Sequence, residues 1–125
     1  MTLMLDLVGL RYRKAGTDPA TGVDCLWAAR AALERIFPDL RPEEFPLDKA
    51  AALEMSESAD AWIRVPSACE LGDVVFGLQP EPWVAVLVDP VGRYCFTANR
   101  TRGTHLVFQG NLGAIHSTFR RRATR

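Results

Sequence analysis

The chain has 125 residues, and its 15 basic and 15 acidic side chains give a formal net charge of zero at pH 7. Apolar residues make up 48% and charged residues 24%, the composition of an ordinary globular domain. This length accommodates one domain, 1–125, with a sizeable core, and the balanced charge favours no particular class of partner.

The charges are unevenly distributed along the sequence. Residues 39–60 carry seven acids and two bases, whereas residues 93–125 carry seven arginines and no acid. A basic end of this kind is usually a solvated face or a tail, and it is also suited to docking on an acidic partner. We expect a basic tail over 120–125, with Arg120, Arg121 and Arg122 as candidate docking residues. No motif supports nucleic-acid binding.

Cysteine spacing and the N-terminal composition exclude several kinds of site. Cys25, Cys69 and Cys95 are too few and too far apart for a disulfide framework or a zinc site, so we expect no metal. No glycine-rich nucleotide loop is present, so we expect no cofactor. Residues 1–8 are apolar but short and include Asp6, which fits neither a signal peptide nor a helix inserted in a membrane.

The first part of the chain is predicted to be mainly helical. Residues 2–9 form a short helix or strand, which their period does not decide. Residues 9–22 are rich in turn formers and in basic side chains, and they form a loop. A second helix is predicted over 47–55 from its composition, so the helical part extends over about 1–58.

The main helix is predicted over 25–37, where apolar side chains recur at helical spacing and Pro38 ends the run. Asp24 precedes it, in position to accept hydrogen bonds from the first free N–H groups. Cys25 is then the first helical residue, where the helix dipole lowers a thiol pKa from about 8.5. A cysteine placed there is a nucleophile, the remnant of one, or a small buried apolar residue.

Short β-type runs separated by turn residues fill the chain from residue 61 onward. They lie at 62–65, 73–78, 83–88, 93–97, 104–109 and 114–119. Tight linkers join antiparallel neighbours, so we expect a β-meander over about 61–120. Helices followed by strands predict an α+β domain, in which N-terminal helices pack on an antiparallel sheet of about five to six strands.

Three segments carry a resemblance that covers most of the chain. Residues 7–16, followed by Gly-Val-Asp-Cys at 22–25, resemble the start of an NlpC/P60 domain, in which an Asp-Cys motif opens the nucleophile helix. Residues 71–76 resemble the family's P-G-D-L/V-V-F strand, and 83–88 stand where the family has H-V-G/A-I/V. These motif sequences are most similar to the version of the domain found in tailed-phage and gene-transfer-agent tail modules. The resemblance implies a papain-like fold and cysteine hydrolysis of cell-wall peptides.

Carried over residue by residue, the resemblance makes Cys25 the nucleophile but places Trp83 at the base position and Thr97 at the orienting position. An indole N–H only donates, so Trp83 cannot take a proton. We therefore favour a catalytically degenerate domain that serves as a structural or interaction part of a phage or phage-like tail tip. Its partners are then other tail or baseplate proteins, with peptidoglycan as a further candidate. Its location is the virion, after assembly in the bacterial cytoplasm.

Two histidines keep a second hypothesis open. His105 and His116 lie in late strands, and a triad is recognised by geometry rather than by sequence order. The alternative is an active cysteine endopeptidase or amidase on peptidoglycan peptides, with one of them as base. The candidate binding residues in and around the former cleft are Tyr12, Asp24, Trp27 and Trp83.

Overall fold

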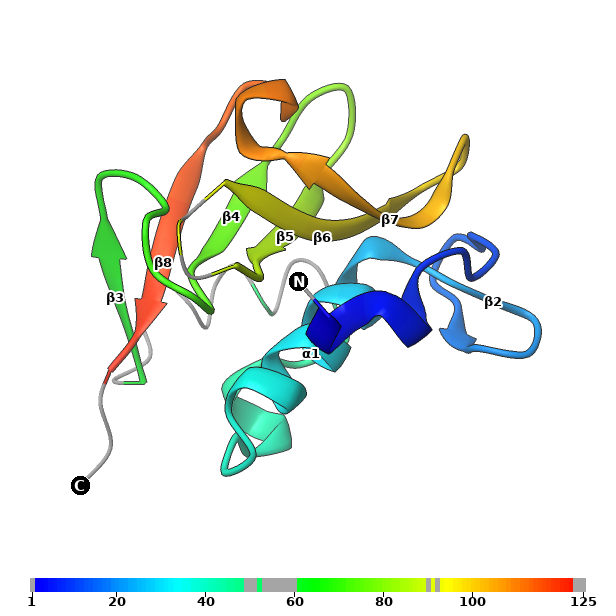
Figure 1. The fold of residues 1–125 in the computed structure, drawn as a ribbon, viewed down its shortest axis with the longest axis horizontal. Helices are drawn as coiled ribbons and strands as arrows, with labels where there is room; N and C mark the ends of the chain where they lie inside the picture. The colour runs from blue at the N-terminus through cyan, green and yellow to red at the C-terminus, as the bar shows by residue number, and fades with distance from the viewer. Residues whose placement is uncertain (1, 49–51, 53–60, 90, 92, 123–125) are drawn as a thin grey trace.

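A computed structural model describes residues 2–48, 52, 61–89, 91 and 93–122 (Figure 1). Its elements, with η for 3-10 helices, are η1 (Thr2–Leu7), β1 (Thr17–Asp18), β2 (Gly22–Val23), α1 (Cys25–Ile36), η2 (Pro42–Glu44), β3 (Trp62–Val65), β4 (Val74–Gly77), β5 (Trp83–Leu87), β6 (Tyr94–Asn99), β7 (Gly103–Phe108), η3 (Gln109–Asn111) and β8 (Ser117–Arg121). Over the described residues, the strands form a two-stranded sheet and a six-stranded antiparallel sheet. The predicted α+β class is confirmed.

The large sheet has the strand order β3-β8-β4-β5-β6-β7. The run from β4 to β7 follows the predicted succession of hairpins. The last strand departs from a meander, because β8 returns to lie between β3 and β4. Packing accounts for this insertion: Phe119 of β8 is buried and meets the ring of Phe76 edge-on, with centroids 5.9 Å apart.

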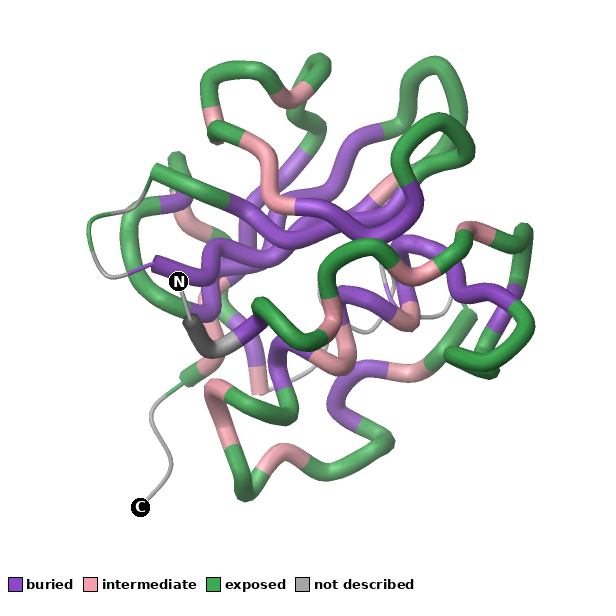
Figure 2. Tube along the Cα trace, turned by 45° about the vertical axis from the view of Figure 1, so that its right-hand side comes forward, coloured by how far each residue is buried: buried purple, intermediate pink, exposed green. Residues whose placement is uncertain are grey.

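The main core lies between α1 and one face of the sheet (Figure 1). Asp24 caps α1 by accepting a hydrogen bond from the Trp27 N–H at 2.8 Å. The helix packs over β5 and β6, and buried residues run through the helix and the central strands (Figure 2). A smaller apolar cluster covers the other face of the sheet, and its buried members are Ala68, Val75, Ala85, Leu87 and Cys95.

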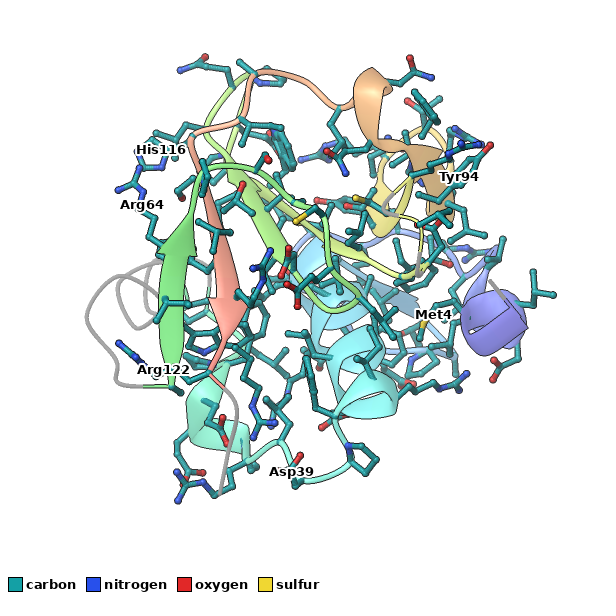
Figure 3. All side chains as sticks on the ribbon, turned by 60° about the vertical axis from the view of Figure 1, so that its left-hand side comes forward. Met4, Asp39, Arg64, Tyr94, His116 and Arg122 are labelled. Atoms are coloured by element: carbon teal, nitrogen blue, oxygen red, sulfur yellow. The ribbon has the colours of Figure 1, made fainter. Side chains whose placement is uncertain are left out.

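The N-terminal segment pairs with the start of β7, at one edge of the sheet. The first residues form the 3-10 helix η1, which places Met4 fully buried in the main core (Figure 3). The Gly9 N–H then donates to the Thr104 carbonyl at 2.9 Å, and the Thr104 N–H donates to the Leu10 carbonyl at 3.0 Å. Backbone groups on the outer edge of β7 are thereby satisfied within the chain.

The second predicted helix falls largely outside the described residues. Of residues 47–55, only 47, 48 and 52 are described. Ala52 is helical and buried, and its N–H donates to the Asp48 carbonyl at 2.7 Å.

The predicted basic tail begins later than expected, because β8 extends through two of its arginines. Arg120 donates to the fully buried carboxylate of Asp73, at 2.9 Å from Nε and 2.8 Å from Nη2. Arg121 donates from Nε to Glu44 at 2.9 Å. Both guanidinium groups therefore stabilise the fold, whereas Arg122 is exposed.

Candidate active site

A cavity of about 430 Å³ opens beside the start of α1. The β4–β5 loop, β6, β7 and the segment after η3 form its other walls. The lining includes Tyr12, Cys25, Trp83, Thr97 and His105. Five residues that the sequence marks as functional candidates are thus brought to one place from distant parts of the chain.

Cys25 is the first residue of α1, and only 3% of its surface is exposed. The Asp24 cap fixes where the helix begins and hence where the thiol stands. Backbone N–H groups in the first turn of a helix have no intrahelical acceptor, and the dipole there favours negative charge. The thiol is therefore placed where a thiolate, or an oxyanion formed beside it, is stabilised.

His105 belongs to β7 and is 6% exposed. Its Nδ1 lies 2.8 Å from the Gly103 carbonyl oxygen. Because a carbonyl only accepts, Nδ1 carries the hydrogen, and Nε2 of the neutral ring carries the lone pair. Burial lowers the pKa of His105; the Gly103 carbonyl opposes this, and the charge of Arg102 lowers it further. The ring is therefore neutral at pH 7, which is the form that accepts a proton.

Trp83 forms a fixed wall of the cavity. Its ring lies against Gly77, its partner across the β4–β5 ladder, where a Cβ atom would stand 2.0 Å from Cε2 of the indole. The indole N–H donates to the Gln79 carbonyl at 3.1 Å. The side chain that the sequence resemblance places at the base position thus shapes the cavity and offers no proton acceptor.

Thr97 and Tyr12 are the other two candidate residues that line the cavity. Thr97 is the cross-strand partner of His105, and its hydroxyl donates to the Val84 carbonyl at 2.7 Å. The Tyr12 ring lies under the guanidinium of Arg100, which is 5.6 Å from the ring centroid. A cation at that distance is attracted by the aromatic face.

Other sequence candidates lie elsewhere. Asp24 caps the helix, and Trp27, on α1, is half-buried and outside the cavity lining. His116 is exposed beside Arg64 at the β3–β8 end of the sheet, also outside the lining (Figure 3). Arg120, Arg121 and Arg122 follow it at that side of the sheet.

Sequence reasoning missed two residues around the cavity. Arg100 lines it and stacks on Tyr12. Gly103 supplies the carbonyl that bonds His105. The Arg102-Gly103 pair at the start of β7 was the available signal for Gly103, because glycine at a turn favours the positive φ found there.

The part of the chain that the structure describes contains no group of three or more His, Cys, Asp or Glu side chains able to hold a metal ion. It also contains no helix that is both long and apolar enough to span a bilayer.

The sequence matches no family model and no curated protein. Its fold is similar to the crystal structure of the NlpC/p60 domain of the peptidoglycan hydrolase SagA. The TM-score is 0.60 at 20% identity, over 94% of this chain and 92% of that one. Identity this low shows the fold alone, and the phage-tail type and the loss of catalysis stay predictions. The chain has an NlpC/P60-like fold.

Proposed function

We propose that the chain is a cysteine hydrolase of peptide or amide bonds, with Cys25 as nucleophile and His105 as base. The supporting observation is that both side chains line one cavity, while His105 is neutral with its lone pair on Nε2. His105 would thereby replace the base that the family carries where this chain has Trp83. Cell-wall peptides are the proposed substrates, since the fold is similar to that of a peptidoglycan hydrolase domain.

The reaction follows general thiol chemistry. Nε2 of His105 takes the Cys25 proton as the sulfur attacks the carbonyl carbon and an S–C bond forms. The imidazolium then gives this proton to the leaving amine as the C–N bond breaks. Water, activated by the neutral ring, adds to the thioester, and the products are a carboxylic acid and the free thiol. The helix N-terminus stabilises the oxyanion in both halves of the reaction.

The test is the pH dependence of Cys25 alkylation by iodoacetamide, followed on the Cys25 peptide by mass spectrometry. We expect the wild-type midpoint to lie below that of an isolated thiol, because the neutral His105 ring takes the thiol proton as the sulfur reacts. In His105→Gln, the midpoint should move toward about 8.5, the value of an unassisted thiol. His116→Gln is the matched control, because it removes an exposed histidine outside the cavity.

Hydrolysis is measured in parallel with peptidoglycan fragments, as newly released amino groups. Release should disappear in Cys25→Ala and fall about 100-fold or more in His105→Gln, the usual contribution of a positioned base. Identical alkylation profiles in His105→Gln and the wild type would overturn the proposal.

The structural role in a phage-like tail tip is the second candidate. Trp83 favours it, because an indole fixed by Gly77 and Gln79 stands where the family has its base. If this role is correct, Cys25 should be alkylated with the pH dependence of an isolated thiol, and peptidoglycan fragments should not be cleaved. The Cys25→Ser chain should still assemble into particles.

A further inference from the structure

The groups that hold His105 in place come from the backbone of a crowded turn. Its ring is anchored through Nδ1 to the Gly103 carbonyl, and this bond fixes which nitrogen carries the lone pair. A base in a thiol site needs such an orienting group, because the wrong tautomer presents a hydrogen to the thiol.

The residue at the family's orienting position does not donate to the ring. Thr97 lies directly across the ladder from His105, but its single hydroxyl hydrogen is given to the Val84 carbonyl. The Gly103 carbonyl is the acceptor that the structure provides for the imidazole N–H.

The N-terminal segment in turn fixes that carbonyl. Gly103 has φ +68°, and a Cβ atom there would stand 2.1 Å from the Leu10 carbonyl oxygen. The next residue, Thr104, accepts from the Leu10 N–H at 2.8 Å and donates its own hydroxyl to the Leu7 carbonyl. Two backbone hydrogen bonds, from the Gly9 N–H to Thr104 and from the Thr104 N–H to Leu10, add to these contacts. We define residues 7–10 as the N-terminal clamp.

We infer that the Gly103 carbonyl, held by the N-terminal clamp, orients His105 and is the third member of the site. This inference rests on the proposed function, since it assumes that His105 is the base of Cys25. Gly103 and Thr104 are positioning residues: they act through the histidine ring and not on the substrate.

The test compares Gly103→Ala with Gly72→Ala in the full chain. Both glycines have positive φ, and a Cβ at Gly72 would stand 2.6 Å from the Phe37 ring, so both substitutions strain the backbone. Only Gly103→Ala should raise the midpoint of the pH profile of Cys25 alkylation. If the midpoint rises by one pH unit, alkylation at pH 6 becomes about tenfold slower. The ¹⁵N shifts of the His105 ring should report loss of the Nδ1–H tautomer in that variant alone.

Thr104→Val tests the clamp with less strain, and it decides the matter if Gly103→Ala does not fold. It removes the hydroxyl that joins Leu7 and Leu10, and we expect a smaller shift in the same direction. The inference is overturned if these variants keep the wild-type profile and tautomer while His105→Gln changes the profile. If His105→Gln changes nothing, the proposed function itself fails.

Discussion

At the scale of single residues, Asp73 is a fully buried carboxylate whose charge is met by donors from two sides. Arg120 donates to both of its oxygens, and the N–H groups of Cys69 and Glu70 donate to Oδ2 at 3.0 Å. Burial raises the pKa of Asp73, but Arg120 and the two N–H groups outweigh it and hold the pKa below 3.8. The native state therefore binds this proton less readily than the unfolded chain.

We predict that Asp73→Asn lowers the free energy of unfolding at pH 7 by about 3–5 kcal/mol, because it breaks a buried ion pair. The wild type should lose this stabilisation as the pH falls below about 3.8 and through the lower native pKa. Urea unfolding at pH 7 and pH 3 measures both effects. Glu70→Gln is the control, because Glu70 also pairs with Arg120 but is 62% exposed. Asp73→Asn as stable as Glu70→Gln would contradict the prediction.

At the scale of elements, the β4–β5 hairpin is built around one glycine–tryptophan pair. The Trp83 ring occupies the space that a side chain at Gly77 would need. We predict that Gly77→Ala and Trp83→Ala each cost about 2 kcal/mol, the first through overpacking and the second through lost burial of a half-buried ring. In the double variant the clash is absent. Its loss of unfolding free energy should therefore be smaller, by at least about 1 kcal/mol, than the sum of the losses in the two single variants. Strictly additive changes in unfolding free energy would show that the Trp83 ring does not block a side chain at position 77.

The elements were predictable where the signal is local. Asp24 and Pro38 mark the helix to within a residue or two, and the six strands were placed within about three residues, because capping and alternation are short-range patterns. The insertion of β8 was not predictable, because strand order depends on which apolar faces meet in space. For the same reason, sequence alone could place Cys25 at a helix start but could not place His105 in the same cavity.

At the scale of the whole molecule, the sheet depends on its last strand. β8 pairs with β3 on one side and with β4 on the other, and it carries the arginines that satisfy Asp73 and Glu44. We predict that deleting residues 117–125 abolishes cooperative thermal unfolding followed by circular dichroism. Deleting only 123–125 leaves β8 intact and should preserve the transition. A sharp transition in the variant that lacks residues 117–125 would show that the other strands fold without β8.

The position of β8 between two earlier strands also determines when the sheet can form during synthesis. A ribosome releases the chain from its N-terminus, so β3 and β4 emerge well before the strand that must separate them. The nascent polypeptide cannot complete its sheet until residue 121 has cleared the exit tunnel, and until then two strand edges are open to other chains.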